Sequence, residues 1–178
     1  MAIRRVTVFG SSRVRPGSAA YETAHAVGAC IARHGRELVN GGYGGTMEAA
    51  ARGAREAGGE VVGITVRTFD YAPPNPFLSR RIETADLFER LARLVDLGDL
   101  YVVMPGGTGT LLEFSLVWEL QNKGISLKPI LADSTWACLL TAFPPGERPV
   151  ADGPSAGPIF TRDLPGELER LLCRLGEA

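Results

Sequence analysis

The sequence of 178 residues contains few of the residue types that mark metal-binding or disulfide-rich proteins. Its three cysteines, Cys30, Cys138 and Cys173, lie far apart and form no CxxC pair, so neither a zinc site nor a disulfide framework is predicted. It has two histidines, His25 and His34, with no third ligand patterned near them. We therefore predict structural roles for both histidines and no bound metal.

Lysine, net charge and long apolar runs are also scarce. All but two of the 19 basic residues are arginine, and Lys123 and Lys128 flank a connection between a predicted helix and a predicted strand. An enzyme that uses pyridoxal phosphate needs a Schiff-base lysine, so a lysine decarboxylase is not indicated. The formal net charge of -1 gives no general attraction for nucleic acid or a membrane surface. No apolar run is long enough for a signal peptide or a membrane span, so we expect a cytoplasmic protein.

Strand-like and helix-like segments alternate along nearly the whole chain. Strands are predicted at 4–9, 37–40, 60–66, 99–104 and 128–132, with a short one at 80–84. Helices are predicted at 18–34, 46–57, 85–97, from the 105–110 turn to 122, from Asp133, and at 165–175; loops rich in proline occupy 67–79 and 144–158. The alternation predicts one α/β, Rossmann-like domain over residues 1–178, with a doubly wound, mostly parallel sheet and helices on both faces.

Three of the predicted strands end in glycine-rich turns, at 10–12, 41–46 and 105–110. In a parallel sheet these turns share one edge, where ligands bind, and a helix that follows such a turn directs its free N–H groups at an anion. One such turn alone could serve only to reverse the chain. Together they predict a phosphate site formed by Gly10, Ser11, Ser12, Gly44, Gly45, Thr46, Met104, Gly106, Gly107, Thr108, Gly109 and Thr110. Because none matches a P-loop or a dinucleotide fingerprint, a mononucleotide is favoured.

Glu113 follows the third turn and has two interpretations. Thr110 and Glu113 have the spacing of a capping box, in which the threonine caps the helix and the glutamate caps back. Alternatively, Glu113 faces the cleft, where a carboxylate could stabilise positive charge on a sugar and position a water molecule.

Arg90 lies in the predicted helix 85–97 and also has two interpretations. The apolar stripe of that helix consists of Leu87, Phe88, Leu91, Leu94 and Val95. Arg90 lies at the flank of the stripe, from which its head group could reach a cleft, whereas Arg93 lies opposite and should be solvated. The alternative for Arg90 is an ion pair with Asp86.

The segment "PGGTGTLLE" resembles the PGGxGTxxE signature of the LONELY GUY (LOG) proteins, the cytokinin riboside 5'-monophosphate phosphoribohydrolases. The resemblance extends from "VFGSS" through "NGGYGGTMEAA" and "NPF" to "KPI". It implies a Rossmann-like fold, a homodimer or larger oligomer, and no metal or redox cofactor. The implied reaction is hydrolysis of a nucleoside 5'-monophosphate to free base and ribose 5-phosphate, with Glu113 and Arg90 as catalytic residues.

The sequence departs from the LOG pattern beside these two residues. Leu91 stands where the family has lysine, and Leu112 where it has an acidic residue. The expected substrate is therefore a purine, AMP-like nucleotide, with cytokinin nucleotides left open. The segment "GGYGGTMEAAARGAREAGGEVVGI" also resembles molybdenum-cofactor carrier proteins, so a nucleotide or cofactor carrier without catalysis is the alternative hypothesis.

Overall fold

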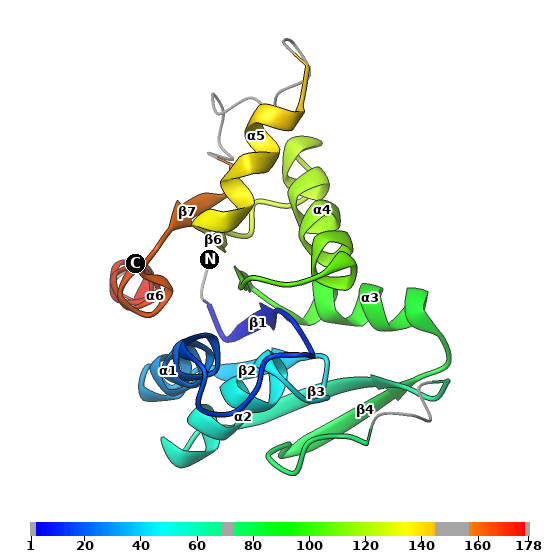
Figure 1. Ribbon diagram of the computed structural model, residues 1–178, viewed down its shortest axis with the longest axis vertical. Helices are drawn as coiled ribbons and strands as arrows, with labels where there is room; N and C mark the ends of the chain where they lie inside the picture. Colours follow the sequence, from blue (N-terminus) through cyan, green and yellow to red (C-terminus); the bar gives the residue numbers. More distant parts are fainter. Residues whose placement is uncertain (1–2, 69–72, 145–156, 177–178) are drawn as a thin grey trace.

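A seven-stranded sheet forms the centre of the computed structural model, which describes residues 3–68, 73–144 and 157–176 (Figure 1). Its strands are β1 (Arg5–Phe9), β2 (Glu37–Asn40), β3 (Val61–Val66), β4 (Arg80–Thr84), β5 (Leu100–Val103), β6 (Ile130–Asp133) and β7 (Ile159–Thr161). Their order is β4-β3-β2-β1-β5-β6-β7, and every neighbouring pair is parallel. The predicted Rossmann-like α/β fold is confirmed.

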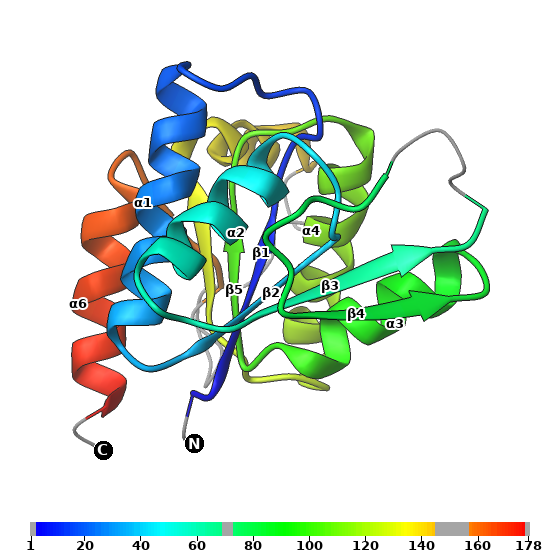
Figure 2. The same ribbon diagram turned by 90° about the horizontal axis from the view of Figure 1, so that it is seen from below.

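Helices cover both faces of the sheet. They are α1 (Ala19–Arg33), α2 (Thr46–Glu56), α3 (Leu87–Leu97), α4 (Thr108–Asn122), α5 (Leu139–Ala142) and α6 (Leu164–Gly176), with a 3-10 helix, η1 (Ser134–Cys138), before α5. One apolar cluster joins α1, α2 and α6 to the sheet, and a second joins α3, α4, η1 and α5 to the other face. Figure 2 shows the layer of α1 and α6 across the sheet from α3 and α4. The sheet is therefore doubly wound, as predicted.

Local sequence signals account for several helix boundaries. The Ser18 side chain accepts a hydrogen bond from the backbone of Tyr21 at the start of α1, and the Asp86 side chain does the same for Glu89 at the start of α3. Close packing between α1 and α2 requires glycine at Gly28, where an added Cβ would lie 1.9 Å from a backbone oxygen of α2. Gly28 thus lets α1 and α2 pack closely against each other on one face of the sheet.

The chain reverses its winding direction between β1 and β5, which are neighbours at the centre of the sheet. From β1 it continues through α1 to β2, whereas from β5 it continues through α4 to β6, on the other side. In open α/β sheets, the crevice at such a switch point is the usual place for a ligand. The first and third glycine turns follow these two strands, so the fold places both at this point.

Three local predictions differ from the structure. The capping-box interpretation, in which Thr110 caps α4, is wrong, because the helix begins at Thr108 after the N-cap Gly107. Leu87 and Phe88 were assigned to the apolar stripe of the predicted helix 85–97 but are 43% and 84% exposed, and the buried apolar residues of α3 are Leu94 and Val95 in its later turns. The helix predicted from Asp133 has its expected Asp133 cap but begins as the 3-10 helix η1.

Two predicted loops lie partly outside the described residues. In the predicted loop at 67–79 these are residues 69–72, and in the predicted loop at 144–158 they are residues 145–156. Within the described ranges, no helix combines the length and the apolar character that crossing a bilayer requires.

Candidate active site

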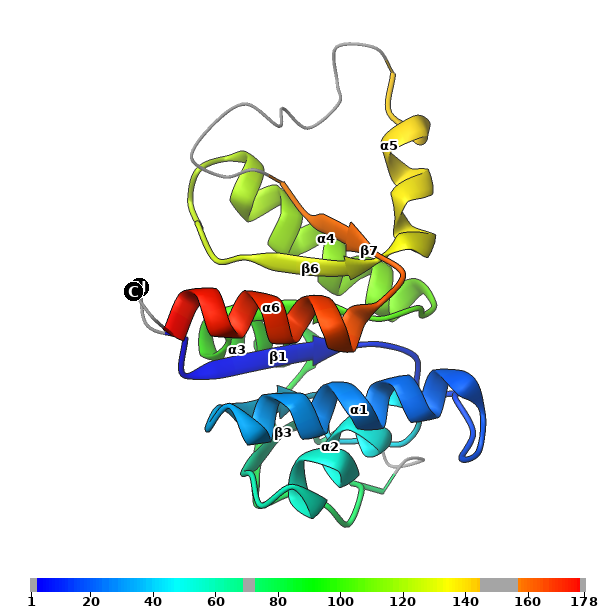
Figure 3. The same ribbon diagram turned by 90° about the vertical axis from the view of Figure 1, so that its left-hand side faces the viewer.

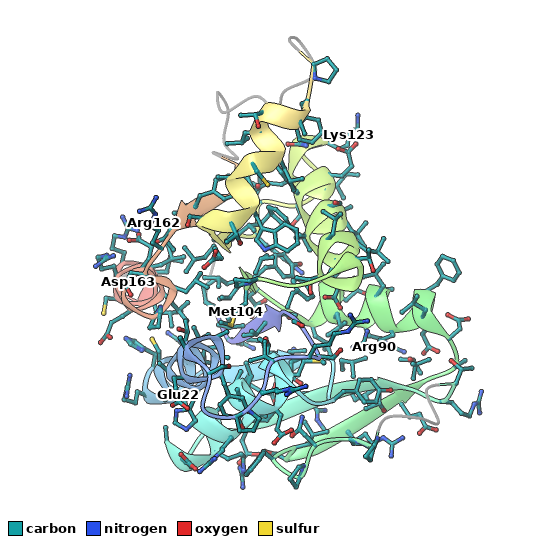
Figure 4. The ribbon with its side chains drawn as sticks, viewed as in Figure 1. Glu22, Arg90, Met104, Lys123, Arg162 and Asp163 are labelled. Atoms are coloured by element: carbon teal, nitrogen blue, oxygen red, sulfur yellow. The ribbon has the colours of Figure 1, made fainter. Side chains whose placement is uncertain are left out.

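Arg90 and Glu113 form an ion pair between α3 and α4. The distance from Arg90 Nη1 to Glu113 Oε1 is 3.7 Å, and the two side chains are only 9% and 13% exposed. Figure 4 shows Arg90 reaching from α3 toward α4. The separation exceeds a hydrogen-bond distance, so both charged groups retain capacity to contact a ligand. The Glu113 carboxylate is thus directed at Arg90 and not back to the start of its helix.

Backbone carbonyl groups hold the guanidinium of Arg90 in place. Its Nε donates to the carbonyl of Ile64 in β3 at 2.8 Å, and its Nη2 donates to the carbonyl of Gly41 at the end of β2 at 3.3 Å. The guanidinium carbon also lies 5.6 Å from the ring centroid of Tyr43, within the range of a cation–π contact. These contacts leave Nη1 directed at Glu113, so Arg90 is a fixed cation.

The alternative partner of Arg90 is occupied elsewhere. The carboxylate of Asp86 accepts a hydrogen bond from the backbone of Glu89 as the N-cap of α3. The alternative interpretation, an ion pair of Arg90 with Asp86, is therefore not what the described residues show. Arg93 is solvated as predicted, with a side chain 55% exposed and an ion pair to Glu89.

Burial changes the protonation of Glu113. Removal of the carboxyl group from water raises the pKa of Glu113 to about 7, although the positive charge of Arg90 acts in the opposite direction. Burial therefore outweighs the nearby cation. A carboxyl group with this pKa exists in both protonation states near neutral pH, which is the range in which an acid or base catalyst is most effective.

This pKa shift predicts how stability depends on pH. Between the ordinary value of 4.5 and about 7, the folded protein binds the Glu113 proton more tightly than the unfolded chain does. The contribution of Glu113 to the free energy of unfolding is therefore full below pH 4.5 and decreases as the pH rises through 7. From pH 4.5 to 7 we expect the free energy of unfolding of the wild type to fall by about 3 kcal/mol relative to that of Glu113→Gln. Urea unfolding of both proteins between pH 4 and 9 measures this difference. If the free energies of unfolding of the two proteins changed in parallel with pH, the prediction would be contradicted.

The first turn of α4 presents free backbone N–H groups. No side chain caps this helix, and among the described residues no acceptor bonds the backbone N–H groups of Thr108, Gly109 and Thr110. An added Cβ at Gly107 or Gly109 would meet no atom within 4 Å, so the space in front of them is open. The turn can therefore bind an anion directly through its backbone.

Other residues of the third glycine-rich turn, at 105–110, and the preceding Met104 have packing roles. An added Cβ at Gly106 would lie 2.1 Å from the hydroxyl oxygen of Thr110, so glycine is needed there for close packing on the helix. Thr110 itself is buried, at 3% exposure. Met104 is also buried, and its carbonyl accepts a hydrogen bond from the indole N–H of Trp136.

The first glycine-rich turn, at 10–12, connects the other two glycine-rich turns. Ser11 donates its backbone N–H to the carbonyl of Pro105 and accepts from the backbone N–H of Thr46. An added Cβ at Gly10 would lie 2.5 Å from the Thr46 side chain, so Gly10 permits this approach. Ser12 is exposed beside them. The structure thus brings the three predicted turns together at one edge.

The second turn differs from the third in its charge. An added Cβ at Gly44 would lie 3.7 Å from a carboxylate oxygen of Glu48, which belongs to the first turn of α2. Gly45 has a φ of 69° and lies against the backbone of Ser11 and Ser12. With an acidic side chain already present and the N–H of Thr46 bonded, this helix end is less suited to an anion than that of α4.

Two residues that support Arg90 were not predicted as site residues. The hydroxyl of Tyr43 donates to the carbonyl of Val66 and accepts from its N–H. Asn75 is buried, and its side-chain amide donates to the carbonyl of Tyr43. Asn75 belongs to the "NPF" segment, and a polar residue between prolines was the available signal. Their contacts with the second turn arise from the tertiary fold.

Both histidines have protein partners in the described part of the chain. His25 pairs with Glu56, and His34 contacts the carbonyl of Cys30. Within the described segments, no group of three or more His, Cys, Asp or Glu side chains has an arrangement suited to a metal ion.

Comparison with known protein families finds one family whose sequence model matches most of the chain. The sequence model of the SLOG cluster4 family matches residues 3–143. A protein of Archaeoglobus fulgidus is 39% identical over 109 residues, which are 61% of this chain and 71% of that protein. The cytokinin riboside 5'-monophosphate phosphoribohydrolase of Rhodococcoides fascians is 33% identical over 129 residues, 71% of this chain and 65% of the enzyme. The match therefore spans just under two thirds of that enzyme.

Solved structures share the fold at lower identity. The molybdenum cofactor binding protein of Rippkaea orientalis superposes with a TM-score of 0.75 at 22% identity, covering 98% of each chain. At this identity the similarity concerns the fold alone.

Proposed function

Because this chain belongs to the SLOG cluster4 family, we propose that it hydrolyses the N-glycosidic bond of a nucleoside 5'-monophosphate. The products are the free base and ribose 5-phosphate. The observation that carries the proposal is the buried pair of Arg90 and Glu113, since Glu113 lies in the same helix whose first turn offers free N–H groups. The name of the Rhodococcoides fascians relative, a phosphoribohydrolase, supports the reaction class.

The proposed phosphate site is the first turn of α4. The N–H groups of Thr108, Gly109 and Thr110 donate to the phosphate oxygens, and the positive end of the helix dipole stabilises the charge. The Thr108 hydroxyl is exposed beside them and adds a donor. This site holds the ribose at a fixed distance from Glu113, one turn further along the helix.

Glu113 acts on the sugar as the bond to the base breaks. The bonding pair leaves with the base, and positive charge develops on the ribose, where an ionised carboxylate stabilises it. Water then attacks the anomeric carbon and transfers a proton to Glu113, and the departing base takes up a proton as Glu113 returns its own to solvent, so that the free base forms and the carboxylate is regenerated. Because the charge exists only in the transition state, the carboxylate stabilises the transition state more than it stabilises the bound substrate, and the rate increases.

Arg90 has two roles in this proposal. Its charge favours the ionised form of Glu113 against the effect of burial. It also lies where its Nη1 can donate to the substrate, because the 3.7 Å gap to Glu113 is not closed by a hydrogen bond. A donor to the departing base neutralises the charge that develops there.

The proposed base is a purine, as in AMP, with cytokinin nucleotides as a more specific case. Leu112 beside Glu113 is 48% exposed, and Leu91 beside Arg90 is partly exposed. These positions give the edge of the site an apolar surface where the LOG pattern has charged residues. An apolar edge fits the flat face of a base better than a second phosphate.

The phosphate site can be tested at a glycine. We expect Gly109→Val to weaken AMP binding about 10-fold or more, because the side chain would fill the space in front of the free N–H groups. It should change the free energy of unfolding by less than about 1 kcal/mol, since an added Cβ meets no protein atom within 4 Å. Titration calorimetry and urea unfolding measure both quantities. Ser115→Val, an exposed position further along α4, is the matched control.

A reaction assay tests the function itself. The purified protein is incubated with AMP, GMP, CMP, UMP and isopentenyl-AMP, and free base and ribose 5-phosphate are quantified by chromatography. We expect base release from the purine 5'-monophosphates and none from adenosine, which lacks the phosphate. Binding of a 5'-monophosphate without base release would contradict the hydrolase.

A carrier function is the second candidate. The fold shared with the molybdenum cofactor binding protein of Rippkaea orientalis supports it, because that fold holds a ligand without requiring turnover. The Arg90 and Glu113 pair would then only position the ligand. Tight binding of molybdopterin, in a protein that leaves every nucleotide intact, would favour the carrier.

We also expect a homodimer or larger oligomer. Leu87, Phe88 and Leu112 are exposed, and they belong to the two helices that carry the ion pair. Large apolar side chains that are exposed on these two helices could be buried in an interface between copies of the chain. Light scattering coupled to size exclusion measures the mass, and a Phe88→Glu variant that becomes monomeric would support this surface as the interface.

A further inference from the structure

A cluster of two cysteines and one histidine lies between α1 and α6, away from the candidate active site. Cys30 belongs to the last turn of α1, His34 is the C-cap residue of that helix, and Cys173 belongs to the last turn of α6. Figure 3 shows the two helices side by side, with these ends near the start of β1. The cluster therefore lies at the opposite edge of the sheet from Glu113.

The hydrogen bonds of His34 determine which ring nitrogen carries the proton. Its Nδ1 lies 2.9 Å from the carbonyl oxygen of Cys30. A carbonyl oxygen only accepts hydrogen bonds, so Nδ1 must be the donor. In the neutral ring, Nε2 then has a free lone pair, and it lies 3.6 Å from the sulfur of Cys173. The thiol of Cys173 donates to Nε2, which forms a thiol–imidazole dyad whose ring is oriented by a backbone carbonyl.

We propose that Cys173 is a reactive thiol and a site of reversible modification by small disulfides. As its sulfur attacks one sulfur of the disulfide, the Cys173 proton passes to Nε2 of His34. The disulfide bond breaks, one half remains on Cys173 as a mixed disulfide, and the other half leaves as a thiolate. That thiolate takes the proton back from His34, so the small disulfide is the oxidant and one thiol is released.

The other groups around the dyad differ in their effects. Cys30 is buried, and desolvation raises its pKa to about 11, so it remains an unreactive thiol. Glu169 on α6 adds negative charge near Cys30, and Arg33 on α1 adds positive charge. Only Cys173 combines exposure with a nitrogen base in contact with its sulfur.

Cys138 provides a matched internal control. It is also exposed, and its thiol also donates a hydrogen bond, but to the carbonyl oxygen of Thr135 at 3.1 Å. A backbone carbonyl cannot take up a proton as imidazole does. The two exposed thiols therefore differ chiefly in whether the acceptor is a base.

The test compares labelling rates of the two thiols in the intact protein. Limiting iodoacetamide at pH 7, followed by peptide mass spectrometry, should label Cys173 about 10-fold faster than Cys138. Oxidised glutathione should form a mixed disulfide on Cys173 first. In His34→Gln, the rate at Cys173 should fall to within about twofold of that at Cys138, whose own rate should not change.

Two results would overturn the proposal. Equal labelling of Cys173 and Cys138 in the wild type excludes a reactive thiol, and this measurement does not depend on the folding of any variant. A Cys173 rate that His34→Gln leaves unchanged excludes His34 as the base. Cys30→Ala, which retains the carbonyl that orients His34, should keep the fast rate, and a loss of that rate would assign the reactivity to Cys30.

Discussion

Glu113→Gln is expected to reduce base release from AMP by about 10³-fold or more while leaving AMP binding within a few-fold of the wild type. Glutamine has the same shape as glutamate but cannot carry the charge that would stabilise a cationic ribose. The proposed phosphate contacts are backbone N–H groups of the first turn of α4, so they should persist in the variant. Single-turnover kinetics and calorimetry on the same preparations separate the two effects.

The matched control for this substitution is Glu119→Gln on the same helix. Glu119 is 56% exposed and contacts only surface groups of its own helix end, Lys123 at 3.4 Å and Asn122 at 3.4 Å among the described residues, so its loss should leave the rate unchanged. Full activity in Glu113→Gln would mean that the carboxylate has no part in the reaction. Loss of AMP binding together with activity would instead show that Glu113 holds the ligand, as the carrier hypothesis requires.

Arg90→Ala is expected to reduce activity about 10²-fold or more and also to destabilise the fold by about 3 to 5 kcal/mol. The substitution leaves the carboxylate of Glu113 buried without its cation. It also removes the donor to the carbonyls of Ile64 and Gly41. Arg93→Ala, which removes an exposed arginine from the same helix, should change neither quantity.

A double-mutant cycle shows how much of this loss comes from the unpaired carboxylate. In Arg90→Ala with Glu113→Gln, no buried charge remains, so we expect the double variant to be more stable at pH 8 than Arg90→Ala alone. Arg90→Lys retains a positive charge but cannot reproduce the two carbonyl contacts and the approach to Glu113. It should recover part of the stability and little of the activity. Additive effects at pH 8 would contradict the energetic coupling of the pair.

The two functional hypotheses share one fold, so the fold does not distinguish them. A protein that binds the molybdenum cofactor superposes on this chain over nearly the whole length of both. The sequence relatives of this chain include a phosphoribohydrolase. Function in such folds depends on the side chains at the switch point. Here those are a fixed cation and a carboxyl group with a pKa of about 7, a combination that favours proton transfer over binding alone.

Much of the architecture follows from local signals in the sequence. Short apolar runs such as 61–66 are typical of strands buried on both faces, and their alternation with helical segments indicates crossovers and a parallel sheet. The short strand at Arg80–Thr84 and the cap at Asp133 were predicted from equally local patterns. The start of α4 was not, because the capping-box spacing of Thr110 and Glu113 also occurs inside a helix that begins earlier.

The sequence by itself determined the α/β class, the sharing of one sheet edge by three glycine turns, and the identity of Arg90 and Glu113 as candidates. Only the tertiary structure decided what these two residues contact. The partners of Arg90 are a carbonyl of β3, the carbonyl of Gly41 directly after β2, and a carboxylate of α4, and no local pattern relates these groups to α3. The shifted pKa of Glu113 likewise results from its burial by the assembled fold, and burial is a property of the packed chain and not of any segment.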